Sequence, residues 1–142
     1  MLRGAFDSAG EFSPAELRTE YERRLIETVD DVGVETVAAE TEIDQETVQA
    51  LVDGDSPELT LDEAADILAT EPDGLDKETI MAEARDILLM GMSMAVLDVE
   101  ALASGIDDEM EPKEIQQKVE GRYPITLAEY ATLHQYIESE KR

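Results

Sequence analysis

The chain has no cysteine, no tryptophan, a single histidine and only 4% aromatic residues. Without cysteine there is no disulfide, no thiolate metal site and no cysteine nucleophile. Because His134 stands alone and no glycine-rich phosphate loop occurs, we expect no enzyme, no cofactor and no bound metal. The longest apolar run, Ile87–Leu97, is far below the roughly 20 residues that cross a bilayer, and residues 1–12 lack the apolar segment of a signal peptide. These absences predict a cytoplasmic protein that makes no contact with membranes.

Basic residues are also scarce, and acidic residues are abundant. The 142 residues include 36 acids and 11 bases, which gives a net charge of -25 at pH 7. The acids are spread over the whole chain, so their mutual repulsion weakens the fold in dilute salt. In molar salt the Debye length falls to about 3 Å and this penalty largely disappears. We therefore interpret acidic stretches as solvated surface. The run Asp107–Glu109 lacks the ligand spacing of a calcium loop.

The sequence contains an internal repeat. Three blocks recur at offsets of 65, 67 and 66 residues, and ten of their positions are identical. A repeated unit of this size predicts a repeated structural unit, with loops that absorb the differences in length. The paired blocks are Val34–Ala38 with Val99–Ala103, Thr47–Gly54 with Glu114–Gly121, and Leu59–Ala65 with Ile125–Ala131.

Helix-start signals recur along both copies. Ser13 followed by Pro14, and the capping boxes at Thr60 and Thr126, mark N-termini. No segment alternates with period two, so we predict no sheet. His134 aligns with Leu68, and we expect it to pack on the last helix in a structural role. Apolar spacing predicts helices at 14–32, 34–41, 45–53, 61–69, 77–97, 99–105, 112–120 and 127–138. The predicted buried face of the long helix consists of Ile80, Ala84, Ile87, Leu88, Met92 and Val96.

The predicted fold is all-α. Residues 1–12 form a flexible leader, and residues 13–72 and 73–142 form two tandem four-helix, helix-turn-helix-like repeats. The boundary between the repeats falls at Pro72–Gly74, where turn-forming residues cluster. A unit of about 65 residues is marginally stable alone, so we expect the two repeats to pack as one compact body.

The segment Val34–Gly54 resembles the helix-turn-helix of the lambda-repressor-like (Cro/C1-type) DNA-binding domains. Its small and apolar positions match that pattern at Val37, Ala38, Ile43, Val48 and Leu51. It departs from the pattern at Glu42, where the family usually has glycine. In the second copy the inter-helix segment Ser104–Glu109 is two residues longer. The whole chain is also similar to a family of small acidic haloarchaeal proteins with no assigned function, which implies a halophilic origin and adds no activity.

The resemblance implies double-stranded DNA as a partner, because the second helix of such a motif enters the major groove. The first copy lacks phosphate-neutralising side chains, since no Lys or Arg lies between Arg24 and Lys77. The second copy is better equipped and would be the DNA-contacting unit of a non-catalytic regulator. The candidate residues are Lys113, Gln116, Gln117, Lys118 and Arg122, with Gln45 and Gln49 in the first copy.

A second interpretation is a protein-interaction adaptor, built on a degenerate helix-turn-helix scaffold without DNA affinity. Met90, Met92 and Met94 flank Gly91 on the long helix, and thioether side chains suit adaptable apolar contacts. The partner would be another protein or a second copy of the chain. These methionines could equally form the seam between the two repeats.

Overall fold

The computed structural model describes residues 9–141, and these residues form eight α-helices, one short 3-10 helix and no strand. The predicted all-α class is therefore confirmed. Each predicted helix is present, and its ends lie within two residues of the prediction. The elements are η1 (Ala9–Glu11), α2 (Pro14–Val32), α3 (Val34–Glu40), α4 (Gln45–Val52), α5 (Leu61–Leu68), α6 (Lys77–Ala95), α7 (Val99–Gly105), α8 (Pro112–Val119) and α9 (Leu127–Glu140).

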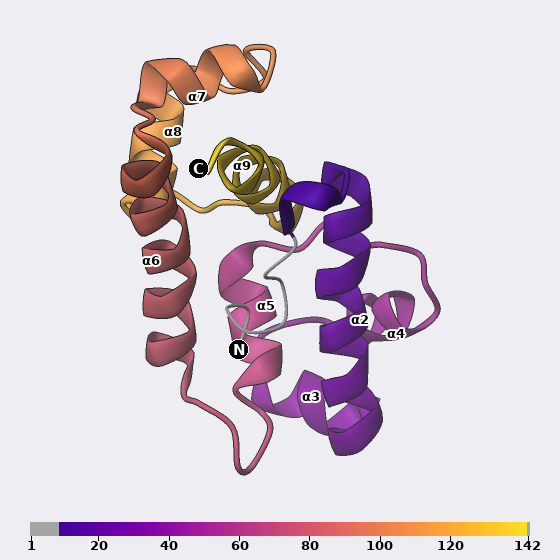
Figure 1. The fold of residues 1–142 in the computed structure, drawn as a ribbon. Helices are drawn as coiled ribbons and strands as arrows, with labels where there is room; N and C mark the ends of the chain where they lie inside the picture. Colours follow the sequence, from indigo (N-terminus) through magenta and orange to yellow (C-terminus); the bar gives the residue numbers. More distant parts are fainter. Residues whose placement is uncertain (1–8, 142) are drawn as a thin grey trace.

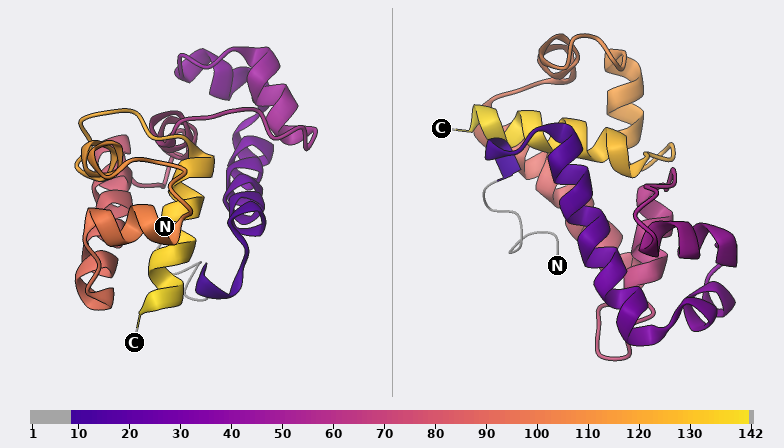
Figure 2. Two further views of the ribbon diagram at one scale, coloured as in Figure 1. Left: turned by 90° about the horizontal axis from the view of Figure 1, so that it is seen from above. Right: turned by 90° about the vertical axis from the view of Figure 1, so that its right-hand side faces the viewer.

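Helix α9 lies at the centre of the molecule, between α2 and α6, and α5 packs beside it (Figure 1). The short pair α3 and α4 lies at one end of this central group. The pair α7 and α8 lies at the opposite end, as Figure 2 shows from two further directions. The last helix of the second half therefore packs against the first helix of the first half. The two halves share one core.

Local sequence signals set the helix starts. Ser13, Thr60 and Thr126 each accept a hydrogen bond from the backbone of the glutamate three residues later, and that glutamate bonds back to the cap. These reciprocal bonds satisfy backbone N–H groups that the first helical turn leaves free. Gly33, with φ of 103°, separates α2 from α3. The apolar positions expected to close the first small core are buried, namely Val37, Val48 and Leu51.

A short antiparallel contact joins the two halves at equivalent positions. Thr60 pairs with Thr126 in an isolated β-bridge. The N–H of Leu61 donates to the carbonyl of Ile125 at 2.7 Å, and the N–H of Leu127 donates to the carbonyl of Leu59 at 2.8 Å. In the sequence repeat Leu61 corresponds to Leu127, and Leu59 corresponds to Ile125. The two bonds are therefore equivalent, as a two-fold relation between the halves requires. The tandem packing stays a prediction, which this symmetric pairing favours.

Two details differ from the sequence expectations. Residues 1–8 of the predicted leader lie outside the described residues, but Ala9 is already buried and η1 packs on α9. A Cβ on Gly10 would lie 2.9 Å from the backbone nitrogen of Ser139, so the packed chain begins earlier than predicted. Val96 was expected in the core and is instead 80% exposed. The reason is that α6 ends at Ala95 and Val96 adopts the left-handed conformation, which turns its side chain away from the buried face.

Candidate functional site

Lys118 does not lie on an open basic face of α8. Its ammonium contacts Glu114 at 2.6 Å and Glu129 at 2.5 Å, and only 12% of its side chain is exposed. Burial alone lowers the pKa of Lys118, but the hydrogen bonds and charges of the two carboxylates outweigh it and raise the pKa above its usual value. Lys118 therefore joins α8 to α9. These ion pairs neutralise its charge, which counts against Lys118 as a DNA-contacting residue.

The other candidates on this part of the chain are more accessible. Lys113 and Gln116 are exposed, and Gln117 is half-buried. Arg122 is 71% exposed and forms an ion pair with Glu120 at 3.2 Å. An exposed pair of this kind contributes little stability, so Arg122 stays free to contact another molecule. In the first copy Gln45 and Gln49 are exposed, and Gln49 donates a hydrogen bond to Asp53 at 3.0 Å.

The outward face of α6 near its C-terminus is apolar. Met90 is 56% exposed and Met94 is 60% exposed, and they stand one helical turn apart with Leu89 beside them. Met92 differs from its two neighbours, because it is half-buried and packs against the core. The seam with α9 is formed by the buried residues of the helix, where Gly91 meets Ile137. The exposed methionines are thus not part of the contact between the halves. We call Leu89, Met90, Met94 and Val96 the α6 outer face.

Val96 completes this outer face in an unfavourable backbone conformation. Its φ of 56° and ψ of 50° lie in the left-handed region, which costs an L-residue roughly 1–2 kcal/mol and suits glycine or asparagine better. A β-branched residue in this region is an outlier. Folding alone does not account for an exposed valine at this position, and strained residues of this kind gather at functional sites.

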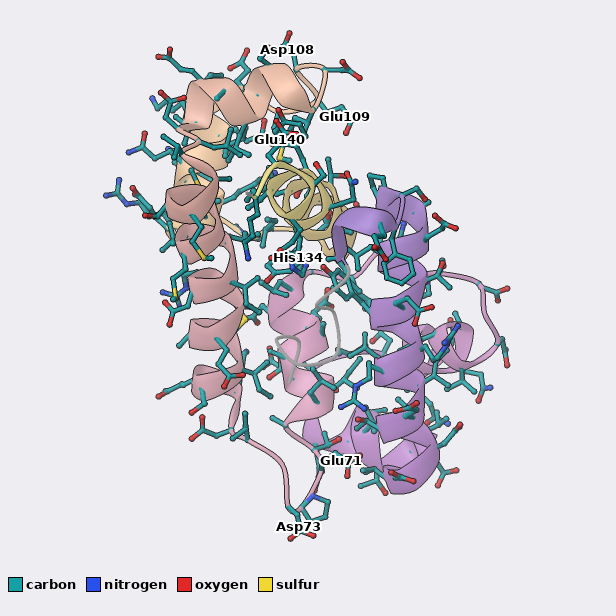
Figure 3. The ribbon with its side chains drawn as sticks, in the orientation of Figure 1. Glu71, Asp73, Asp108, Glu109, His134 and Glu140 are labelled. Atoms are coloured by element: carbon teal, nitrogen blue, oxygen red, sulfur yellow. The ribbon has the colours of Figure 1, made fainter. Side chains whose placement is uncertain are left out.

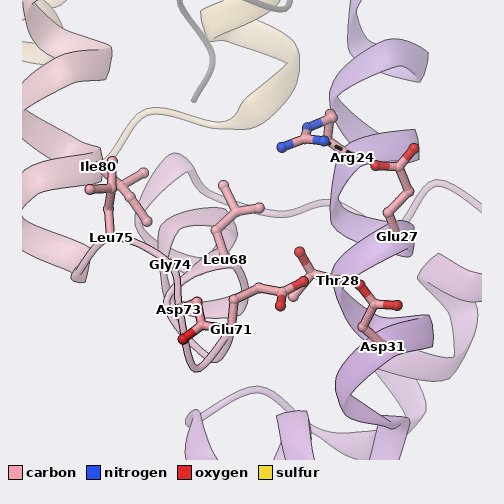
Figure 4. Close-up of a pocket in the computed structure, with 10 residues that line it drawn as sticks. All are labelled: Arg24, Glu27, Thr28, Asp31, Leu68, Glu71, Asp73, Gly74, Leu75 and Ile80. Atoms are coloured by element: carbon pink, nitrogen blue, oxygen red, sulfur yellow. Dashed lines mark hydrogen bonds and ion pairs between the residues drawn. The ribbon is translucent and has the colours of Figure 1, made fainter.

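A cavity of about 290 Å³ lies between α2, α5 and the loop that leads to α6. Figure 4 shows Thr28 and Asp31 of α2 facing Glu71 and Asp73 across it, with the Arg24–Glu27 ion pair at its rim. The carboxylates outnumber the single cation. The cavity is therefore negatively charged, whereas a nucleic-acid site needs positive charge.

His134 has a structural position, as the sequence alignment with Leu68 suggested. It is buried in the middle of the molecule (Figure 3) and packs against the rings of Tyr21 and Tyr130. The hydroxyl of Tyr21 lies 2.5 Å from Nδ1 of His134, and Glu138 lies 3.6 Å from Nε2. Burial raises the pKa of Tyr21 well above its usual value, so the hydroxyl keeps its proton. The carboxylate of Glu138 beside Nε2 favours a proton on that nitrogen, and the Tyr21 hydroxyl then donates to Nδ1. Neutral His134 therefore carries its own proton on Nε2.

The run Asp107–Glu109 lies at the outer end of α7, where Figure 3 labels Asp108 and Glu109. All three side chains are exposed. Within residues 9–141, no group of three or more His, Asp or Glu side chains is arranged to hold a metal ion. In the same part of the chain, no single helix has the length and apolarity to cross a membrane. Together α6 and α7 reach that length and composition, but they meet at a bend of 91°.

Residues 17–140 match a family of unknown function, DUF5791. The chain belongs to that family. The match begins at Leu17 in α2 and ends with α9, so it covers both halves and not the helix-turn-helix-like segment alone. No curated protein and no solved structure matches the chain. Membership brings no activity with it, so a function has to be argued from the surfaces described above.

Proposed function

We propose that the protein is a non-catalytic adaptor that binds another protein through the α6 outer face. The observation that carries the proposal is the exposure of Met90, Met94 and Val96 close together in the sequence at the end of α6, in a chain of which 33% of residues are charged. Exposed apolar groups that lie together mark interaction sites more often than scattered ones do. Flexible methionine side chains adapt to the shape of a partner.

Charge indicates the chemistry of the partner. Asp86 lies one turn before Met90 on the same side of α6, and Asp98 follows Val96; both are exposed. A partner with an apolar centre and a rim of Lys or Arg would complement this arrangement. The net charge of -25 attracts a basic protein over long range and repels a second copy of the chain. We therefore propose a partner protein with a basic rim.

Site-specific cross-linking tests the proposal. A photo-crosslinking amino acid at position 94 should capture a partner in the cells that make the protein, whereas the same amino acid at the exposed position 116 should not. The captured protein, once purified, should bind the wild-type chain in calorimetry. We expect Met94→Glu to weaken binding at least about tenfold, because a carboxylate would be buried at the contact. The matched control, Ala82→Glu, adds the same charge to an exposed position of α6 and should change little.

Three outcomes would contradict the proposal. Capture that is no stronger at position 94 than at position 116 would remove the α6 outer face from the contact. Equal affinity of the wild-type and Met94→Glu chains for the purified partner would do the same. Cross-linked dimers of the chain itself, together with a dimer in sedimentation, would replace the basic partner with a second copy.

DNA binding through α8 is the second candidate function. The observation that favours it is the accessibility of Lys113, Gln116 and Arg122, with Tyr123 also exposed just beyond the helix. The carboxylates that hold Lys118 and contact Arg122 count against it, because they repel phosphate.

Fluorescence anisotropy with duplex DNA at two salt concentrations distinguishes the candidates. If α8 binds DNA, affinity should fall with salt and Lys113→Glu/Arg122→Glu should abolish it. Arg23→Glu on α2, where Arg23 is also exposed and paired, is the control. Lys118→Glu is unsuitable, because it would place three carboxylates together and destabilise the contact between α8 and α9. Absence of binding at both salt concentrations would eliminate this candidate.

A further inference from the structure

A second cavity lies where the two halves meet. Its volume is about 410 Å³, within the range of small-molecule sites. Its walls come from the start of α5, from α6 and from the segment between α8 and α9, next to the Thr60–Thr126 bridge. Basic, aromatic and apolar side chains share the lining, notably Leu61, Met81, Arg85, Arg122, Tyr123 and Ile125.

Arg85 is the unusual member of this set. Within residues 9–141 it makes no ion pair or hydrogen bond, and its Nε atom is buried without a partner. Acids outnumber bases more than three to one in this chain, and the half-buried Arg85, which lines the cavity, still forms no ion pair with a carboxylate of residues 9–141. A buried donor that lacks an acceptor is costly, which indicates that an acceptor is missing.

The Arg85 guanidinium packs against the backbone of Gly121. Gly121 has a φ of +80°, and a Cβ at that position would lie 3.2 Å from Nε and 3.3 Å from Cζ of Arg85. The guanidinium therefore lies directly against the glycine. Any side chain at position 121 would adopt a strained conformation and displace the arginine. A planar guanidinium is well suited to bind a carboxylate or phosphate through two hydrogen bonds.

The rest of the lining indicates what the anion is attached to. The ring of Tyr123 is 56% exposed, and Leu61, Met81 and Ile125 form an apolar wall. Such a surface offers a stacking position for a flat ring. Arg122, whose pair with Glu120 is exposed, provides a second cation at the rim. Asp62 lines the recess but is paired with Lys77, and Glu120 is paired with Arg122. These carboxylates would repel the extended backbone of a duplex, so the cavity favours a small ligand.

We propose that this cavity binds a small aromatic anion. Its carboxylate or phosphate lies on Arg85 and Arg122, and its ring lies between Tyr123 and Met81. Lys118 also borders the cavity, but its charge is committed to Glu114 and Glu129. The site is separate from the α6 outer face, so the two proposals stand or fall independently.

Phenyl phosphate and benzoate are the probes, and they distinguish the two kinds of anion. NMR titration of the full chain should shift the amides of residues 121–125 and 60–62, with a dissociation constant of about 1 mM or tighter for the preferred probe. Inorganic phosphate has only the anionic group and phenol has only the ring. Each should bind at least about tenfold more weakly than the preferred probe. Duplex DNA should not displace the bound probe.

Three variants test the roles of the lining residues. Arg85→Gln should weaken binding at least about tenfold, since it removes a charge-assisted contact. Arg23→Gln makes the same charge change on an exposed part of α2 and should have no effect. Tyr123→Ser should weaken binding and Tyr123→Phe should retain it. Met94→Glu should bind the probe like the wild type, which separates this result from the adaptor proposal. Circular dichroism melting identifies any variant that fails to fold.

The proposal is overturned if neither probe shifts these amides at a concentration about 20-fold above the expected dissociation constant of about 1 mM. It is also overturned if Arg85→Gln binds as tightly as the wild type. Inorganic phosphate that binds as well as phenyl phosphate would exclude a role for the ring. Displacement of the probe by duplex DNA in an Arg85-dependent manner would assign the cavity to nucleic acid instead.

Discussion

At the scale of single residues, His134 shows how position decides chemistry. It is 2% exposed and accepts a hydrogen bond from Tyr21, which comes from the other half of the molecule. Burial lowers its pKa from 6.5 to about 4, and nearby Glu138 only partly opposes this effect. The histidine is therefore neutral at physiological pH. It acts as a polar link between α2 and α9.

The pH dependence of stability should reveal this residue. Between about pH 6.5 and 4, the unfolded chain binds a proton at His134 and the folded chain does not. The free energy of unfolding should therefore decrease as pH falls through this window, by up to roughly 3 kcal/mol, with no further loss from this group below about pH 4. Denaturant titrations of the wild type and His134→Leu at pH 7.5 and 5 measure the effect. His134→Leu copies the equivalent residue, Leu68, and identical pH slopes would contradict the assignment.

Val96 is a second position where a single residue has a measurable effect on the free energy of unfolding. Val96→Gly should raise the free energy of unfolding by about 0.5–1 kcal/mol, because relief of left-handed strain exceeds the entropy that glycine adds to the unfolded chain. The same change should weaken binding of the partner proposed for the α6 outer face. Thermal unfolding measures the first effect. Leu97→Gly, at a half-buried neighbour outside the left-handed region, is the control and should destabilise.

At the scale of elements, the close approach of α6 and α9 explains why a glycine lies inside a long helix, which the helix pattern alone does not explain. Helices α6 and α9 meet at Gly91, which is buried inside a 19-residue helix. A Cβ at this position would lie 2.6 Å from Cγ2 of the fully buried Ile137. Glycine weakens a helix by about 1 kcal/mol relative to alanine, so this contact explains its presence. The Lys118 ion pairs similarly fix α8 to α9.

Gly91→Ala should therefore destabilise the protein by roughly 1–3 kcal/mol in spite of its better helix propensity, because the methyl group overpacks the contact with α9. Ser93→Ala, at an exposed position of the same helix, should instead stabilise slightly. Denaturant titration of both variants checks the prediction. In Gly91→Ala/Ile137→Ala the two effects should be less than additive, because the second change removes the clashing atom. Simple additivity would mean that the contact does not limit the approach of α9.

At the scale of the whole molecule, net charge and the shared core have opposite effects on the stability of the folded state. The charge of -25 favours expansion of the chain. The contacts of α9 with α2 and α6 bury the apolar residues of both halves in one cluster. Ion pairs relieve the repulsion locally, as where Lys77 joins Asp62 and Asp66.

Salt should therefore stabilise the folded protein. Raising KCl from 0.1 M to 1 M shortens the Debye length from about 10 Å to about 3 Å, so repulsion between exposed carboxylates falls and the free energy of unfolding rises. Thermal unfolding across this range measures the effect, with sucrose at equal osmolality as the control for excluded-solute stabilisation. A melting temperature that does not depend on KCl would show that self-repulsion is not a significant term.

The sequence by itself determined the elements of this protein. Caps such as Ser13 and Thr126, and apolar spacing along each segment, placed all eight α-helices, because helix formation depends on neighbours within one or two turns. The burial of Val37 and Leu51, and the internal position of His134, also followed from local pattern.

Only the tertiary structure decided the surfaces. Lys118 and Lys113 look alike in sequence. Glu129 of another helix neutralises Lys118, whereas Lys113 stays exposed. Val96 continues an apolar pattern but lies one residue beyond the helix. Arg85 resembles any other arginine in the sequence, and only the fold brings Gly121 against it. Charge pairing and close approach depend on which distant segments meet. That information lies in how the helices pack in three dimensions, not in the spacing along any one of them.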